Sequence, residues 1–306
     1  AQQSHLPYLN ETVIVMLILP LFFFSLTAVR WLASSAANST VPFASYLEKI
    51  PSSPSCSVTA CIPVARKGGK WIETHEQLKL EADSVVENNK VIFFGDSITE
   101  FLRGTYLGRP QQALLKNKQV FEQDIVSKFG GALALGISGD ETQHLLWRLQ
   151  NGELPDGLKL KSDVAVVLHI GTNNLSGNQE VGHIAQGVIA CIESVLKALS
   201  DATVILLGIL PRRQRVATEQ INALLRHHIE EINNHLQHYV DTKSSSRLIY
   251  LDCGSLFLMK DEKAMNLDTY EIDKSLMQDF LHPTAKGYHN LFTTCLGPEL
   301  EKHLIE

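Results

Sequence analysis

Short apolar runs alternate with longer segments of helical periodicity from about residue 70 onward. We expect five buried strands, at residues 91–94, 132–135, 164–170, 203–210 and 248–251. Between them, apolar residues recur every three or four positions over residues 111–128, 141–149, 179–199 and 219–240, and a last helix is expected after Pro283. Strands that are apolar on both faces and alternate with helices indicate a parallel sheet covered on both sides. We therefore predict an α/β fold.

An uncharged apolar segment precedes this pattern. Residues 13–29 read VIVMLILPLFFFSLTAV, which is just long enough to cross a bilayer as a helix of about 20 residues. We predict a single membrane-spanning helix within residues 1–33 that attaches the protein to a membrane. A cleaved signal peptide and a buried core helix are the alternatives. Arg30 follows the span and favours a cytoplasmic C-terminal side, but sequons at Asn10 and Asn38 flank the span on both sides, so the membrane side stays open.

Residues 34–69 are rich in Ser, Pro and Ala and show little periodicity, so we expect a stem or linker before a globular domain at residues 70–306. Cys56 and Cys61 lie close together in this stretch, where they pair if the compartment is oxidising and otherwise remain thiols. Cys191, Cys253 and Cys295 fall in apolar patterns, so we predict that they are buried structural thiols.

The charge distribution argues against nucleic-acid binding, because the net charge is -6 and the Lys and Arg residues are scattered. One predicted helix is rich in potential metal ligands: His227, His228, Glu230, Glu231 and His235. Without HExxH spacing, a solvated helix face explains them better than a metal site. We predict that neither a metal nor another cofactor is required.

Polar clusters follow the first three predicted strands, and a fourth precedes the last helix. Ser97, in Gly-Asp-Ser, can be an exposed nucleophile or a helix N-cap. Gly139 and Asn173 can donate hydrogen bonds to an oxyanion or simply form turns. Asp279 and His282 can be a general base with its orienting carboxylate or an unrelated surface pair. Because ligands bind outside the carboxyl ends of parallel strands, their joint occurrence predicts acyl-transfer chemistry.

These four blocks resemble those of the SGNH (GDSL) hydrolase superfamily: GDS with Ser97, a Gly block with Gly139, GTNN with Asn173, and DxxH with Asp279 and His282. Within it the chain is most similar to the catalytic subunits of intracellular platelet-activating factor acetylhydrolase, through GISGDETQHLLWRLQNGEL, IGTNN, GILPR and DFLHPTAKGY. The resemblance implies a three-layer, flavodoxin-like sandwich with a five-stranded parallel sheet in the order 2-1-3-4-5. It also implies an oxyanion hole made of the Ser97 and Gly139 backbone N–H groups and the Asn173 side chain.

The resemblance implies a serine esterase that hydrolyses short-chain, acetyl-like esters of lipid or carbohydrate through an acyl-enzyme. It is compatible with a homodimer or with a subunit of a membrane complex. The departures are the N-terminal span and stem, and His169, where those subunits carry an aromatic residue. The alternatives are a catalytically unused fold serving as a membrane-bound subunit or scaffold, and a carbohydrate O-acetylesterase of the secretory pathway. The sequon at Asn174 is expected at the floor of the site and unglycosylated.

Overall fold

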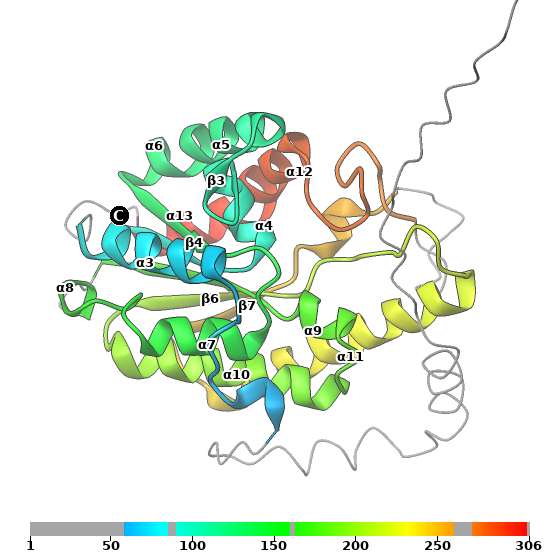
Figure 1. The fold of residues 1–306 in the computed structure, drawn as a ribbon, viewed down its shortest axis with the longest axis horizontal. Helices are drawn as coiled ribbons and strands as arrows, with labels where there is room; N and C mark the ends of the chain where they lie inside the picture. The colour runs from blue at the N-terminus through cyan, green and yellow to red at the C-terminus, as the bar shows by residue number, and fades with distance from the viewer. Residues whose placement is uncertain (1–57, 85–89, 160–162, 260–270, 305–306) are drawn as a thin grey trace, which may run out of the picture. The chain divides into compact units, whose positions relative to one another are not determined.

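The structure of the chain, a computed structural model, describes residues 58–84, 90–159, 163–259 and 271–304 (Figure 1). Its centre is a parallel sheet of five strands: β1 (Val91–Gly95), β4 (Ala132–Gly136), β5 (Ala165–His169), β6 (Thr203–Leu207) and β7 (Leu248–Leu251). They lie in the order β4-β1-β5-β6-β7. Counted along the chain this is the order 2-1-3-4-5, so the α/β sandwich predicted from the sequence is confirmed.

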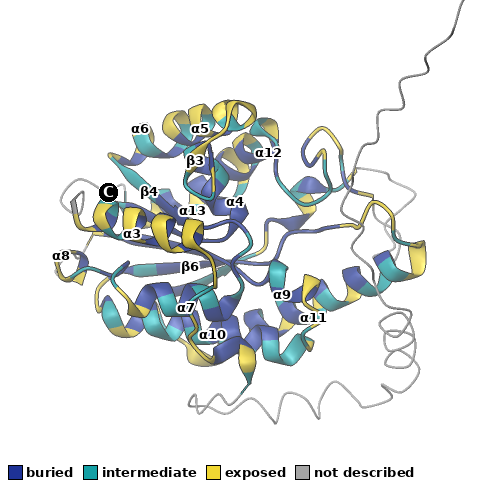
Figure 2. Ribbon diagram, in the orientation of Figure 1, coloured by how far each residue is buried: buried dark blue, intermediate teal, exposed yellow. Residues whose placement is uncertain are grey.

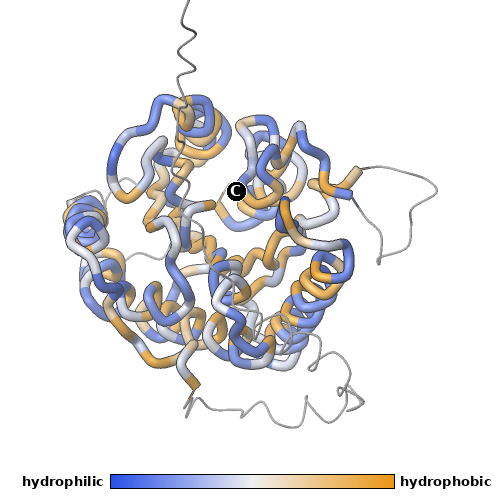
Figure 3. Tube along the Cα trace, turned by 45° about the vertical axis from the view of Figure 1, so that its right-hand side comes forward, coloured by the Kyte–Doolittle hydropathy of each residue, from blue (hydrophilic) through white to orange (hydrophobic). Residues whose placement is uncertain are grey.

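Helices cover both faces of the sheet, because successive strand residues point to opposite sides. Ile92 and Phe94 face one hydrophobic cluster, and Val91 and Phe93 face the other. The first cluster is covered by α3 (Gly69–Ser84), α7 (Thr142–Gln150), α10 (Val181–Ala198) and α11 (Glu219–Lys243). The second is covered by α5 (Leu115–Phe121), α12 (Ala285–Asn290) and α13 (Gly297–Leu304). Figures 2 and 3 show the buried, hydrophobic strands between these two layers.

Several short elements depart from the predicted helices. The helix expected over residues 111–128 is a succession of turns, in which a π-helical turn at Glu122–Val126 separates α5 from α6 (Ser127–Phe129). The last helix is divided in the same way by a π-helical turn at Leu291–Leu296. A short helix, α4 (Ser97–Glu100), starts where the sequence offered Ser97 as a helix N-cap. Other short elements were not predicted: the β2–β3 hairpin (Thr105–Tyr106 and Arg109–Pro110), α8 (Asp156–Lys159) and α9 (Thr172–Ser176).

Residues 58–68, at the end of the expected linker, pack against the globular unit. A 3₁₀ helix at Thr59–Cys61 lies on α7 and α10, and Ala60 is fully buried there. The Ala60 carbonyl accepts a hydrogen bond of 2.8 Å from Thr142 Oγ1. A glycine at position 187 of α10 makes this approach possible, because a Cβ there would lie 2.7 Å from the same carbonyl. The globular unit therefore begins before residue 70.

The predicted membrane-spanning helix lies outside the described residues. Among the residues that are described, one helix, α10, is long and apolar enough to cross a membrane, and half of it is buried inside the molecule. It packs against α7, α11 and β6. Burial in the core therefore accounts for the apolar composition of α10.

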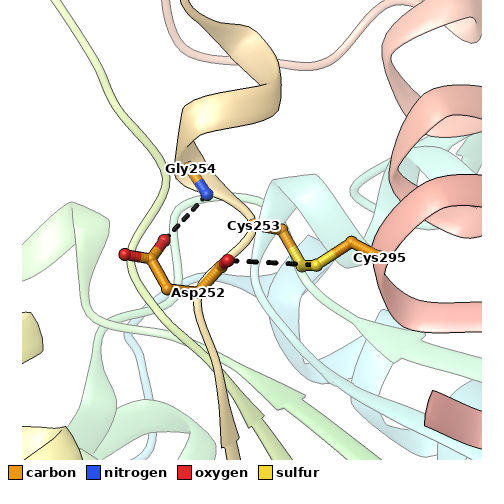
Figure 4. Close-up of a disulfide and its surroundings, with 4 residues drawn as sticks. All are labelled: Asp252, Cys253, Gly254 and Cys295. Carbon is orange, nitrogen blue, oxygen red and sulfur yellow. Dashed lines mark hydrogen bonds between the residues drawn. A yellow bond between two sulfur atoms is a disulfide. The ribbon is translucent and has the colours of Figure 1, made fainter. Parts of the chain in front are cut away.

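Cys253 and Cys295 form a disulfide, so the prediction that both are thiols was wrong (Figure 4). Cys253 follows β7 and Cys295 lies in the last π-helical turn, with their Cα atoms 6.0 Å apart. The apolar pattern indicated burial, which is right for Cys253 but wrong for Cys295, which is half-buried, and it did not indicate that these two segments meet. Cys191 is a buried free thiol, as predicted. Cys61 is disulfide-bonded, and Cys56 lies outside the described residues.

Candidate active site

The strand register brings three chain segments together at the carboxyl edge of the sheet. Gly95 of β1 lies between Gly136 of β4 and His169 of β5. A Cβ on Gly95 would lie 2.4 Å from the His169 carbonyl oxygen, and one on Gly136 would lie 2.4 Å from the Glu100 amide nitrogen. Only residues without a side chain allow α4 to pack this closely on the strand ends. The turn that carries Ser97 is therefore fixed directly against the sheet.

Asp96, not Ser97, caps α4. Its Oδ1 accepts a hydrogen bond of 3.0 Å from the Ile98 amide, which satisfies a free N–H of the first helical turn. The N-cap alternative for Ser97 is therefore wrong, and its hydroxyl is free for another partner. Burial raises the pKa of Asp96 from 3.8 to about 7, against the lowering effect of the Ile98 hydrogen bond.

The hydroxyl of Ser97 meets the ring of His282. Ser97 Oγ lies 2.9 Å from His282 Nε2, although the two residues are 185 positions apart. On the other side of the ring, His282 Nδ1 lies 2.6 Å from Asp279 Oδ2. The Phe101 ring stacks on the imidazole at a centroid distance of 4.6 Å. Three side chains from two clusters that lie far apart in the sequence thus form one hydrogen-bonded row.

Asp279 is held as an ionised acceptor. Its Oδ1 accepts the backbone N–H groups of Leu281 at 3.0 Å and His282 at 2.7 Å, while Oδ2 faces the His282 ring. Burial alone would raise the pKa of Asp279, but these hydrogen bonds outweigh it and lower the pKa to about 2. The carboxylate can therefore orient the imidazole and balance a positive charge on it.

Phe280, which lies between Asp279 and His282 in the sequence, has a left-handed backbone with φ of 64°, which is uncommon for a bulky residue. Its carbonyl accepts a 3.0 Å hydrogen bond from the Arg213 amide, and the side chains of Arg213 and Lys274 lie 6.0 and 5.4 Å from its ring centre. These contacts hold the Asp279–His282 loop in this shape. Phe280 also borders a hollow of about 440 Å³, whose other lining residues are Arg213, Met259, Glu271, Ile272, Asp273 and Lys274.

The Gly139 turn is tied to α4 by a buried carboxylate that sequence reasoning missed. Glu100 Oε2 accepts hydrogen bonds from the Ser138 amide at 2.7 Å and its hydroxyl at 2.5 Å. Glu100 Oε1 accepts from Thr105 Oγ1 and the Gly108 amide. Gly139 itself has φ of 82°, a backbone conformation that is unfavourable for residues with a side chain. The signal in the sequence was weak, because Glu100 stands beyond the GDS block in an ordinary helical context.

Asn173 reaches the same turn from α9. Its Nδ2 donates to the Asp140 carbonyl at 2.8 Å and lies 3.4 Å from Asp96 Oδ2.

The next residue, Asn174, is fully buried and bonds to Thr142 through both ends of its amide. A buried, hydrogen-bonded amide cannot carry a glycan, so the geometry favours the expectation for the Asn174 sequon.

A buried charged network underlies both turns. The Arg148 guanidinium donates to Asp140 Oδ2 at 2.8 Å, to the Gly95 carbonyl at 2.8 Å, and to Glu153, and none of the three charged side chains is exposed. Trp71 Nε1 donates to the other Asp140 oxygen at 2.6 Å. Burial raises the pKa of Asp140 to about 6, against the effects of Arg148 and Trp71. Arg148 stands within the family-like stretch after Gly136, but its partners are not local in sequence.

No group of three or more His, Cys, Asp or Glu side chains among the described residues could hold a metal ion. The helix that bears the five possible ligands is α11. His235 is buried, whereas His227 and Glu230 are exposed, so these residues do not share a single solvated face. The expectation of one solvated face was therefore wrong for His235.

Comparison with known proteins finds a matching family and similar chains. The GDSL-like lipase/acylhydrolase family matches residues 93–289. Platelet-activating factor acetylhydrolase IB subunit alpha1 of Rattus norvegicus is 30% identical over 225 residues, which cover 72% of this chain and 78% of that protein. Subunit alpha2 of the same organism is 28% identical over 224 residues, with coverage of 72% and 79%.

Solved structures share the fold. A GDSL-like lipase from Bacteroides thetaiotaomicron superposes with a TM-score of 0.53 at 21% identity, over 74% of this chain and 97% of that one. The family match covers more than half of the chain and spans Ser97, Gly139, Asn173, Asp279 and His282. The chain therefore belongs to the GDSL-like lipase/acylhydrolase family and is a carboxylic ester hydrolase.

Proposed function

We propose that the chain hydrolyses short-chain, acetyl-like esters of lipid or carbohydrate through an acyl-enzyme on Ser97. One observation carries the proposal: Ser97 Oγ lies 2.9 Å from His282 Nε2, and His282 Nδ1 lies 2.6 Å from Asp279 Oδ2. A nucleophile, a base and an orienting carboxylate in hydrogen-bonding reach of one another are the arrangement that acyl transfer requires. The acetyl preference is supported by the acetylhydrolase subunits among the relatives.

In the first half-reaction, His282 Nε2 takes the Ser97 proton while Oγ attacks the carbonyl carbon of the ester. The tetrahedral intermediate collapses when the imidazolium gives this proton to the leaving alkoxide, and the acyl group stays on Ser97. In the second, His282 deprotonates water, which attacks the acyl carbon; the bond from this carbon to Ser97 Oγ then breaks, the imidazolium returns the proton to Oγ, and the acid is released. Asp279, with its pKa lowered to about 2, stays ionised and supports the imidazolium in both steps.

The negative charge of the intermediate needs hydrogen-bond donors, and we assign these to the Ser97 and Gly139 backbone N–H groups and the Asn173 side chain. A primary amide has two N–H donors. Asn173 gives one to the Asp140 carbonyl at 2.8 Å, which orients the group. The contact with Asp96 Oδ2 is long, at 3.4 Å, and therefore weak, so giving the second N–H to the oxyanion costs little.

An activity-based probe tests the proposal. A fluorophosphonate should label the wild-type chain, and Ser97→Ala should abolish the labelling. Ser200→Ala is the matched control, because Ser200 is exposed and bonds only to its neighbour Asp201 among the described residues. A folded wild-type chain that is neither labelled nor active would refute the esterase and support the scaffold alternative. A panel of acetylated glycans and short-chain lipid esters then separates the two substrate classes.

We further propose that the domain faces an oxidising compartment, because disulfides such as Cys253–Cys295 persist there and are rare in the cytosol. Attachment to a membrane through residues 1–33 and assembly into a homodimer or membrane complex stay predictions. Protease protection in intact membranes tests the attachment and the side of the membrane on which the domain lies. Thiol alkylation before reduction tests whether Cys253 and Cys295 are paired. A protease-exposed cytosolic domain with both thiols alkylated would refute this orientation.

A further inference from the structure

The peptide group between Ser138 and Gly139 accepts a hydrogen bond from Arg66, a residue outside the family-matched region. Arg66 lies in the packed segment before α3, whereas the family match begins at residue 93. Its guanidinium Nη1 donates a 2.7 Å hydrogen bond to the Ser138 carbonyl. The group also covers Gly139, where a Cβ would lie 2.8 Å from Nη1 and 2.9 Å from Nη2. A side chain at position 139 would therefore displace the guanidinium.

The geometry of a peptide bond links this contact to the oxyanion hole. In a trans peptide the C=O and the following N–H point in opposite directions within one rigid plane. The C=O of Ser138 and the N–H of Gly139 belong to the same plane, so a donor fixed on the carbonyl also fixes the direction of the N–H. Hydrogen bonding to the carbonyl polarises the whole group and makes its N–H a stronger donor, more so when the partner is charged.

Other contacts of Arg66 do not explain its position. Within the described part of the chain, the one carboxylate that pairs with it is Asp140, whose Oδ1 lies 3.8 Å away, which is too long for a hydrogen bond. Asp140 is already satisfied by Arg148 at 2.8 Å and Trp71 at 2.6 Å. Glu100 meanwhile holds the preceding peptide through the Ser138 amide. Among the residues that the structure describes, the short contact of Arg66 is thus with the Ser138 carbonyl alone.

We propose that Arg66 is a positioning residue, which orients and polarises the Ser138–Gly139 peptide so that the Gly139 N–H is a strong donor to the oxyanion. The segment before α3 is in this view a functional part of the domain, and its packing through Ala60 on α7 and α10 serves to deliver the guanidinium. The catalytic meaning rests on the proposed function; the orientation of the peptide does not.

Kinetics of Arg66→Ala test the catalytic part. We expect kcat to fall about tenfold with KM and melting temperature unchanged, because the donor is weakened; losing a whole oxyanion donor costs roughly 100- to 1,000-fold. Arg66→Lys should recover part of the rate, and guanidinium ions at non-denaturing concentration should rescue Arg66→Ala. The exposed neighbour provides the control, so Lys67→Ala should behave as wild type. An Arg66→Ala enzyme with wild-type kcat, or one that guanidinium does not rescue, would overturn the inference.

An NMR experiment separates this inference from the proposed function. Ser precedes Gly at only two places in the sequence, Ser138–Gly139 and Ser176–Gly177. Carbonyl-¹³C serine and ¹⁵N-glycine labelling therefore gives two cross-peaks, of which the second is an internal reference. In Arg66→Ala the Ser138 carbonyl and Gly139 amide should both move upfield, while the reference stays in place. If the first peak stays too, the inference fails; if it moves but the wild type hydrolyses no ester, only the proposed function fails.

Discussion

Replacement of Arg148 by Met tests whether the buried charged network holds the two turns of the site. Met has a similar length and no charge, and it adapts to irregular space. The variant would leave Asp140 and Glu153, both fully buried, without their cation. It would also remove the donor to the Gly95 carbonyl, two residues before Ser97. The substitution should therefore lower the stability of the fold and also disturb the strand end that precedes Ser97.

The expected loss is large because one partner of a buried ion pair is removed. Breaking such a pair costs about 3–5 kcal/mol. For a domain of this size that lowers the melting temperature by roughly 6–20 °C, since each kcal/mol corresponds to about 2–4 °C. Lys302→Met is the surface control: Lys302 pairs with Glu299 at 2.6 Å, but it is 64% exposed, and such pairs contribute about 0–1 kcal/mol.

The pH dependence distinguishes charge from packing. Burial already raises the pKa of Asp140 to about 6, and loss of Arg148 raises it further. A carboxyl group with a raised pKa in the folded state destabilises the fold at high pH, and the penalty is relieved as protons bind on acidification. In urea unfolding, the deficit of Arg148→Met should therefore shrink between pH 8 and pH 5. A deficit below about 1 kcal/mol that does not change with pH would refute the reasoning; should the variant not fold, Arg148→Lys should give an intermediate loss.

Three further predictions follow from the geometry. Asp279→Asn should lower kcat by about 10⁴-fold with KM little changed, because the His282 tautomer is no longer fixed; steady-state kinetics of a folded variant with nearly wild-type kcat would contradict it. Asp96→Asn should remove a loss of stability that the wild type suffers as pH rises from about 4 to about 7, because burial raises the Asp96 pKa from 3.8 to about 7; parallel stability curves for the two proteins would contradict it. Gly187→Ala should lower the melting temperature, since its Cβ would lie 2.4 Å from Thr142 Oγ1, whereas Gly182→Ala on the same helix meets nothing within 4 Å and should not; equal effects would contradict the packing of residues 58–61.

The sequence predicted those parts of the fold that depend on local patterns. Each sheet strand is a short run of apolar residues, and all five runs were placed within a few residues of the observed strands. The residues of the proposed triad were selected because each stands in a recognisable block at a strand end or before the last helix. Their meeting at one edge follows from the parallel sheet, so Ser97 and His282 could be paired across 185 positions.

Contacts between segments without a local signature could not be predicted in this way. Cys253 and Cys295 fall in apolar runs that look the same for a thiol and a disulfide. Arg66 belongs to a stretch that resembles a linker, and the packing of Ala60 and the bond from Arg66 to Ser138 show that it is part of the domain. Arg148 bonds to Gly95, which is 53 positions away. Such partners are set by tertiary structure, not by periodicity.

The buried carboxyl groups near Ser97 are costly for stability, and this cost bears on the function. Burial raises the pKa of Asp96 to about 7 and of Asp140 to about 6, so the surroundings of each carboxyl group disfavour its ionised form. Both contact Asn173, through a side chain and a backbone carbonyl. A chain used only as a scaffold would gain stability from a neutral residue at position 96 and lose nothing. If the site is an esterase, Asp96→Asn should gain the same stability above pH 7 but should also lower kcat, because destabilising groups persist where activity depends on them.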